Sequence, residues 1–167
     1  MVRALLSVRL ADTHAAREDG TMPDRYDAPN RAARLGNAVF RWLAEMGVSI
    51  AGTRALRVRG RKSGKQHTVV VNLLTIDGVD YLVSPRGNTQ WSRNVRAAGA
   101  VEVGPRWRSV RARATELDDE AKPEVLKRYL ARWYWQVKGF VGGLTPKSSD
   151  EELRAAAPTI PVFALSR

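Results

Sequence analysis

The sequence predicts an α+β domain in which a mainly antiparallel sheet or small barrel of about six strands is flanked by helices. Successive β-rich runs fill residues 55–117 and are separated by turn signals rather than by long helices. Helical patterns precede and follow these runs. Strands and helices do not alternate as they do in a doubly wound nucleotide-binding sheet, which argues against that fold. At 167 residues the chain is long enough for one domain with a substantial core.

The first part of the chain combines an irregular segment with a helical one. Residues 1–27 show no clear period and are rich in Arg, Asp, Ala and Gly, so we expect a mobile arm. Apolar residues then recur at helical spacing within 28–49, namely Leu35, Val39, Trp42, Leu43 and Met46. Because Gly47 is a suitable stop for this helix, we expect the domain to span residues 28–167 and to begin with it.

The middle of the chain shows local alternation and turn chemistry. The segment "ALRVRG" at 55–60 alternates apolar and basic residues. Two β-rich runs within 67–85 are joined by Asp77-Gly78, which is a strong hairpin signal. A short helical link is expected within 84–99, before the next strands begin.

The last third contains two more strands, a helix and a final strand. Between Trp107 and Val110, within the β-rich segment 100–117, the alternation slips by one residue and predicts a bulge. Acidic residues crowd the start of 118–137, which predicts a helix. Its apolar stripe comprises Val125, Leu126, Tyr129, Leu130 and Trp133. The closing "TIPVFAL" is typical of a strand, and Pro161 predicts an edge position or an unpaired site in the ladder.

A net charge of +11 is the strongest global feature and indicates an anionic partner. Six cations and no acid occur between Arg54 and His67, and seven Arg accompany a single acid, Glu102, between Arg86 and Arg113. The middle of the chain therefore generates the positive field. Nucleic acid, an anionic membrane surface and a polyanionic small molecule all fit this charge.

Composition argues against several kinds of site. The chain has no Cys, so it has no disulfide or thiolate nucleophile, and with only two His we expect no bound metal. No run of 18 apolar residues predicts a membrane span. The lack of Cys fits a reducing compartment, so we expect a cytoplasmic protein, and the basic arm leaves peripheral contact with an anionic membrane open. No recognisable nucleic-acid-binding motif is present.

The segment "RGRKSGKQHT" at 59–68 is a candidate anion-binding loop. Its two Gly allow a sharp turn that presents N–H groups, while Ser63 and the cations Arg61, Lys62 and Lys65 can donate to phosphate oxygens. It is not a Walker loop, because G-x-x-x-x-G-K-[ST] is absent. A solvated turn between two strands is the alternative interpretation.

A second candidate is "SPRGNTQWSRNVRAAG" at 84–99. Trp91 and Asn94 lie three residues apart and would share one face of a helical turn. The indole offers a flat apolar wall and the amide offers both a donor and an acceptor, a combination that suits a planar heterocycle. The alternative is that Trp91 caps the core and Asn94 ends a helix.

Together these stretches resemble the deazaflavin-dependent nitroreductase family. The resemblance rests on "RGRKSGKQHTVVVNLL", "DGVDYLVSPRG", "WSRNVRAAGAVEV" and the closing "TIPVFAL", and it covers roughly residues 30–166. Members of the family are split β-barrel oxidoreductases that use the reduced 8-hydroxy-5-deazaflavin coenzyme F420, so the resemblance implies a split β-barrel here. The phosphate and oligoglutamate tail of this coenzyme would account for the basic charge.

The resemblance also implies roles for matching residues. The loop that holds the phosphate and tail side of the coenzyme is matched by Arg61, Lys62, Ser63, Gly64, Lys65 and His67. The region near the deazaflavin ring is matched by Ser84, Arg86, Gly87, Trp91 and Asn94. His67 stands where an Arg is frequent, and Arg86 stands where a Lys is common. The loop between Arg86 and Trp91 is shorter than in the nitroimidazole-reducing branch.

That branch also places several tyrosines near its substrate, in the last helix. This chain keeps Tyr134, while Val137 and Phe140 stand at the later positions, which argues against nitroimidazole activation. Tyr134 is therefore the candidate catalytic residue, as the donor of a proton or hydrogen bond to the acceptor. Packing of Tyr134 on the barrel is the alternative.

The reaction that the resemblance implies is hydride transfer from C5 of the reduced deazaflavin to an electron-poor acceptor, such as a quinone, an enone or a nitro compound. The protein would align two planar molecules, exclude water and stabilise charge on the acceptor. Two other classes stay open. One is a related split barrel that binds FMN, and the other is a non-catalytic basic module that binds nucleic acid or anionic lipid.

Overall fold

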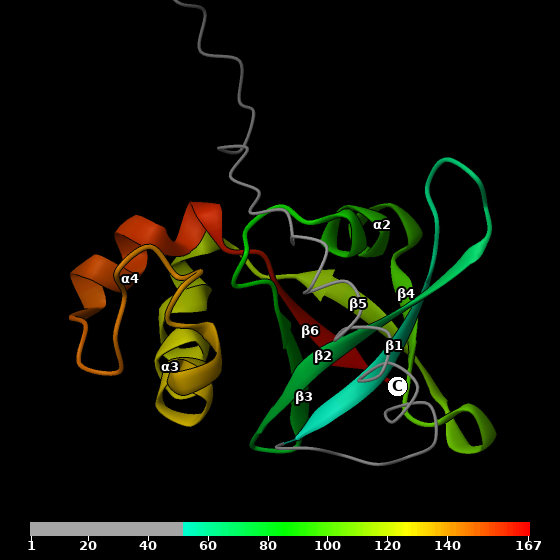
Figure 1. Ribbon diagram of the computed structural model, residues 1–167, viewed down its shortest axis with the longest axis horizontal. Coiled ribbons are helices and arrows are strands. Elements are labelled where there is room, and N and C mark those ends of the chain that lie inside the picture. The colour runs from blue at the N-terminus through cyan, green and yellow to red at the C-terminus, as the bar shows by residue number, and fades with distance from the viewer. Residues whose placement is uncertain (1–51) are drawn as a thin grey trace, which may run out of the picture.

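The computed structural model describes residues 52–167, and the strands within them form a closed antiparallel barrel (Figure 1). The order around the barrel is β1-β2-β3-β6-β5-β4. The strands are β1 (Thr53–Arg59), β2 (Gln66–Ile76), β3 (Val79–Val83), β4 (Ala100–Val103), β5 (Val110–Glu116) and β6 (Val162–Ser166). The arm expected at 1–27 and the helix expected within 28–49 lie outside the described residues.

Helices cover one end and one side of the barrel. Figure 1 shows α2 across one end, and α3 and α4 beside each other at one side. The helices are α2 (Gln90–Ala98), α3 (Lys122–Val137) and α4 (Asp150–Ala156), with short 3₁₀ turns η1 (Arg106–Arg108), η2 (Asp119–Ala121) and η3 (Ala157–Thr159). Within residues 52–167, none of the helices is long and apolar enough to cross a membrane.

Several local expectations are confirmed. Asp77 and Gly78 have φ values of 48° and 83°, the left-handed pair that closes a tight hairpin between β2 and β3. The expected helix at 118–137 consists of η2 followed by α3, with acidic side chains in its first turns. The helical link within 84–99 is α2, which begins at an N-cap, Thr89.

One local expectation is wrong, and only one of the two alternatives expected for Pro161 is confirmed. The break in apolar–polar alternation between Trp107 and Val110 does not mark a bulge. The chain leaves the sheet there through η1, and pairing resumes at Val110, which lies opposite Val103. The last strand is not at an edge, because β6 lies between β3 and β5 in the closed barrel. Pro161 precedes β6, and its carbonyl accepts a hydrogen bond from Ser84 N at 2.9 Å. Because Pro161 lies outside the strand, its missing N–H removes no hydrogen bond from the sheet.

The apolar core has two parts, separated by the wall of the barrel. Alternate residues of the strands, such as Leu56, Val71 and Phe163, fill the barrel interior. The other cluster lies between the outer wall and α3, where Leu74 of β2 packs with Trp133, which is 1 % exposed. Outward-facing side chains of β2 therefore lie beneath α3, and this arrangement creates one of the cavities described below.

Candidate active site

The loop between β1 and β2 is a compact turn that its own backbone closes. Gly60 N donates to Lys65 O at 2.8 Å, and Gly64 N donates to Gly60 O at 2.8 Å. Gly64 has a φ of 66°, a left-handed conformation that glycine adopts without strain. The turn leaves Arg61 and Lys62 exposed at its tip.

Arg61 ties this loop to α2. Its guanidinium Nη1 donates to Asn94 Oδ1 at 3.0 Å and to Gln90 Oε1 at 3.0 Å, and its backbone N–H donates to Asn94 Oδ1 at 3.2 Å. Gln90 and Asn94 lie one helical turn apart, so both face the loop, which projects beside α2 (Figure 1). The oxygen of Asn94 is thus committed to the loop, and only its amide N–H groups remain for a ligand.

Other donors of the loop remain available to an anion. Neither the backbone N–H groups of Lys62 and Ser63 nor the Lys62 ammonium has a hydrogen-bond partner among residues 52–167. Ser63 Oγ accepts from Lys65 N at 3.3 Å and keeps its hydroxyl hydrogen for another acceptor. Lys62 and Ser63 are therefore the best-placed donors for a phosphate oxygen.

His67 packs directly over Gly60. A Cβ at Gly60 would lie 2.6 Å from His67 Nε2 and 2.8 Å from His67 Cδ2. A methyl group at Gly60 would therefore displace the exposed imidazole from this position. His67 reaches the same cavity as the loop, which is consistent with its expected place on the phosphate side.

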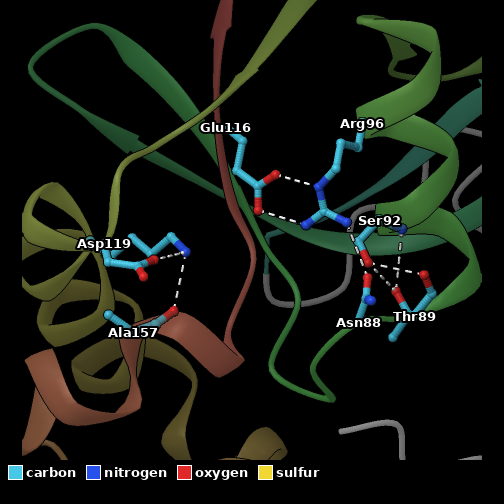
Figure 2. A network of polar contacts seen from close by, with 8 residues as sticks. Asn88, Thr89, Ser92, Arg96, Glu116, Asp119 and Ala157 are labelled. Carbon is cyan, nitrogen blue, oxygen red and sulfur yellow. Dashed lines mark hydrogen bonds and ion pairs between the residues drawn. The ribbon is translucent and has the colours of Figure 1, made fainter. Parts of the chain in front are cut away.

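The segment after β3 is a buried, hydrogen-bonded turn. Ser84, which is fully buried, donates from Oγ to Gly87 O at 2.7 Å, and Gly87 has a φ of 79°. Thr89 then caps α2, because its Oγ1 accepts from Ser92 N at 3.3 Å (Figure 2). Ser84 and Gly87 thus fix where α2 begins, and with it the position of Trp91.

An ion pair holds α2 against the sheet. Arg96 of α2 donates from Nε and Nη2 to Glu116 of β5 at 2.5 and 2.7 Å, and from Nη1 to Asn88 at 3.2 Å (Figure 2). The hydrogen bond to Glu116 raises the pKa of Arg96. This fork geometry fixes the helix in rotation as well as in position.

Two cavities adjoin at Trp91. The first, which we call the loop cavity, has a volume of about 500 Å³ and is lined by Gly60, Arg61, Lys62, Ser63, His67, Thr68, Val69, Gln90, Trp91 and Asn94. The second, the α3 cavity, has a volume of about 480 Å³. It is lined by Thr53, Val70, Val71, Asn72, Val83, Ser84, Pro85, Arg86, Thr89, Trp91, Tyr129, Trp135, Gln136, Val137 and Phe140. Trp91 also packs against Phe163, with ring centroids 6.2 Å apart, so this wall is anchored in the barrel core.

Arg86 and Phe140 meet at the α3 cavity. The Arg86 guanidinium carbon lies 3.7 Å from the centroid of the Phe140 ring, which is a cation–π contact. The pair joins the turn after β3 to the segment after α3. Trp135, which is 66 % exposed, also lines this cavity and presents a wide apolar surface to solvent.

Three polar side chains also line the α3 cavity. Asn72 of β2 donates from Nδ2 to Gln136 Oε1 at 3.1 Å and to Tyr129 Oη at 3.4 Å. Tyr129 is only 2 % exposed, and burial raises its pKa to about 12. Its hydroxyl accepts from Asn72, and its own hydrogen has no acceptor among residues 52–167. A neutral donor is thus available in a site whose lining is mainly apolar and aromatic.

Most of the expected site residues are brought together. Six lie on the loop cavity: Arg61, Lys62, Ser63, His67, Trp91 and Asn94. Ser84 and Arg86 lie on the α3 cavity, where Trp91 joins them, and Gly87 shapes the turn behind them. Lys65 lines neither cavity, and Gly64 borders a different hollow. Tyr134 is half-buried against the α3 core cluster and does not line the α3 cavity, so its catalytic role stays a prediction.

Sequence reasoning missed the polar trio of Asn72, Tyr129 and Gln136. Tyr129 was placed in the apolar stripe of the helix, and it is indeed buried with the core cluster. Asn72 carried a usable signal, because it interrupts the apolar run "VVVNLL" in a strand with one face against α3. A polar residue at such a position needs a partner, and here the partners come from α3.

The pair of cavities fits a molecule with an anionic end and a planar apolar end. Cations and free N–H groups surround the loop cavity, whereas apolar and aromatic side chains dominate the α3 cavity. No acidic residue of the described chain lines either one. The donor set therefore suits a ligand that carries a phosphate group and a planar ring.

Several solved structures are similar to this chain. A solved structure described as a domain-swapped dimer is 20% identical with a TM-score of 0.51, over 82% of this chain and 100% of that one. An F420-H2 dependent reductase is 21% identical with a TM-score of 0.48, over 69% of this chain and 94% of that one. General Stress Protein 26 from Bacillus anthracis is 16% identical with a TM-score of 0.46, over 76% and 88% of the two chains.

The first of these likenesses supports the split β-barrel fold. No curated protein sequence matches the chain. The family model described as F420H(2)-dependent quinone reductase matches residues 34–137, well over half of the chain, and includes both the loop and the turn that form the two cavities. The chain therefore belongs to the F420H(2)-dependent quinone reductase family and is an oxidoreductase whose coenzyme is F420.

Proposed function

We propose that the loop cavity holds the phosphate and tail side of F420, and that the α3 cavity holds its ring together with a quinone-type acceptor. The observation that carries this proposal is the meeting of a cationic and an apolar cavity at a single aromatic wall, Trp91. A coenzyme with a planar ring and an anionic chain would cross that wall.

On the anionic side, the protein supplies charge and fixed donors. Lys62 and Ser63 donate to phosphate oxygens, while Arg61 holds the loop on α2 so that these donors keep their positions. His67 stands over Gly60 and closes the far side of the loop. These groups contribute to affinity rather than to the chemical step.

On the apolar side, the protein aligns two planar molecules. When bound, the reduced coenzyme supplies a hydride to an electron-poor acceptor. Trp91 forms a flat wall for a ring, and the Arg86–Phe140 pair and the exposed Trp135 restrict water at the opening. A flat, apolar quinone suits this lining.

Tyr129 would orient the acceptor. Because its hydroxyl accepts from Asn72, its hydrogen points elsewhere and is free to bind a carbonyl oxygen in the cavity. Negative charge grows on that oxygen as the hydride arrives, so the hydrogen bond strengthens in the transition state. Its pKa of about 12 keeps Tyr129 neutral and able to donate at every ordinary assay pH. Tyr134 remains a second proposed donor, and the two tyrosines can be tested separately.

The experiment that tests this function combines binding and turnover. Purified protein is titrated with F420 and, in parallel, with FMN, and F420H2 oxidation is then followed with menadione as the acceptor. We expect saturable binding of one F420 per chain, weaker binding of FMN, and quinone-dependent oxidation. Equal affinities for both flavins, or an F420 affinity unchanged by both Lys62→Ala and Trp91→Ala, would contradict the proposed placement. A cytoplasmic location and contact of the arm with a membrane stay predictions.

A further inference from the structure

A second cationic site lies on the outer face of the barrel, over β1, β4 and β5. Two cavities of about 570 and 240 Å³ occur there, and both are lined by Arg57, Gln66 and Glu102. We call the pair the arginine cavity. Its four guanidinium groups belong to Arg57, Arg59, Arg106 and Arg111. They come from β1, η1 and β5, so the fold gathers them from three separate elements.

Arg57 is the central group of this cavity. It is only 7 % exposed, and its Nη1 donates to Gly104 O at 3.1 Å. Its Nη2 is buried and has no hydrogen-bond partner among the described residues. A guanidinium has donors and no acceptor, so this N–H group requires an acceptor from elsewhere. A buried, charged donor without a partner costs free energy, and an oxyanion would remove that cost.

The acid that borders the cavity does not neutralise it. Glu102 stands opposite Arg57 in the β1–β4 register and opposite Arg111 in the β4–β5 register. Nevertheless, no ion pair joins Glu102 to either Arg in the described part of the chain. Its carboxylate instead accepts from Gln66 Nε2 at 3.5 Å. The cavity thus carries four positive charges and one negative charge.

We propose that the arginine cavity is an oxyanion-binding site that takes a phosphate or carboxylate group on Arg57 and Arg111. The planar fork of Arg matches two oxygens of such a group. The β1–β2 loop separates this site from the loop cavity, because Ser63 lines the loop cavity and Gly64 lines the arginine cavity. The two sites are therefore adjacent but distinct, and neither needs the other to be filled.

The test uses inorganic phosphate and succinate as separate probes of the full chain, followed by amide chemical shifts in NMR titrations. Shifts at Glu102 and Gly104 report the arginine cavity, whereas shifts at Gly60 and Ser63 report the loop cavity. Arg57→Met removes the central donor. Arg111→Met changes an exposed residue, so the test remains valid if Arg57→Met impairs folding. The matched control is Arg154→Met, an equal loss of charge on exposed α4.

We expect saturable shifts at Glu102 and Gly104 with at least one probe, and the probe that binds more tightly identifies the anion class. Affinity at this site should fall at least tenfold in Arg57→Met and at least threefold in Arg111→Met, with no change in Arg154→Met. Glu102→Gln should raise the affinity, because it removes the repelling charge. The absence of saturable shifts with both probes, or equal losses in all three Arg variants, overturns the proposal. A Glu102→Gln protein that is less stable and binds no tighter would show that Arg57 and Glu102 pair in solution, and would also overturn it.

Discussion

Replacing Tyr129 with Phe is the most selective perturbation that the structure offers. It removes one oxygen from a side chain that is 2 % exposed and leaves the ring in the core cluster. Asn72 loses one hydrogen-bond acceptor but keeps Gln136 Oε1 at 3.1 Å. The protein should therefore fold, with a loss of stability of roughly 0.5–1.5 kcal/mol, the usual net contribution of one hydrogen bond.

The effect on catalysis should be larger than the effect on stability. A neutral hydrogen bond to the acceptor would contribute roughly twofold to thirteenfold to kcat/KM, and a bond to an oxygen that gains charge would contribute more. We therefore expect kcat/KM for menadione to fall by about tenfold, which is about 1.4 kcal/mol. The dissociation constant for F420 should change little, because the Tyr129 hydroxyl is proposed to bind the acceptor and the cations and N–H donors proposed to bind the phosphate line the other cavity.

The assay measures menadione reduction at saturating F420H2, alongside F420 affinity by fluorescence. Tyr134→Phe is the matched control, since it removes the same atom from the same helix at a residue that does not line the α3 cavity. Unchanged kcat/KM in Tyr129→Phe would refute the proposed hydrogen bond. Equal losses in both variants would point to packing of α3 rather than to a donor, and a loss confined to Tyr134→Phe would transfer the role to Tyr134.

Three further predictions concern affinity and stability. Because Lys62 is exposed, Lys62→Ala should raise the F420 dissociation constant by roughly threefold to fivefold, and high salt should shrink the difference; equal affinity at low salt would contradict the phosphate contact. Asn94→Ala and Arg61→Ala should each weaken F420 binding without additivity, because each breaks the same tether between the loop and α2; additive losses in the double variant would disprove the coupling. Burial raises the pKa of Tyr129 to about 12, whereas the pKa in the unfolded chain is about 10. The contribution of this pKa difference to the free energy of unfolding is therefore complete below pH 10 and is lost as the pH rises toward 12. The unfolding free energy of wild type should therefore drop relative to Tyr129→Phe by roughly 1.4 kcal/mol per pH unit in that window, and parallel curves would contradict the assignment.

Local chemistry explains which parts of the fold were predictable. Asp77-Gly78 strongly favours a tight hairpin through its own backbone preferences, so the strands on either side of it could be placed from the sequence. Helix α4 was missed although Ser149 and Glu152 form a capping box, because its 7 residues are too short to show a helical period. Of the two alternatives for Pro161, the edge position was wrong because closure of the barrel depends on pairing between strands distant in sequence.

In the candidate site too, features set by local sequence were predictable and features set by long-range packing were not. The loop residues and Trp91 belong to contiguous segments, and short patterns reveal them. Asn72 contacts Tyr129 and Gln136, which follow it in the sequence by 57 and 64 positions. Only the packing of α3 on β2 brings these side chains together. The environment of Arg57 is equally non-local, since this buried side chain donates to Gly104 O, 47 positions away in the sequence. Periodicity gives the face of a strand but not what covers it.

The division into two cavities implies that affinity and turnover are separable in this protein. Substitutions at the tip of the loop remove charge from the loop cavity and leave the α3 cavity intact, so they should act on coenzyme affinity alone. Substitutions in the polar trio leave the cations of the loop cavity in place, so they should act mainly on turnover. Among the described residues, Trp91 alone lines both cavities, so Trp91→Ala should lower affinity and turnover together. It should also lower the melting temperature, because the indole packs on Phe163. A Trp91→Ala protein with normal turnover at saturating F420H2 would mean that the ring does not rest on this wall.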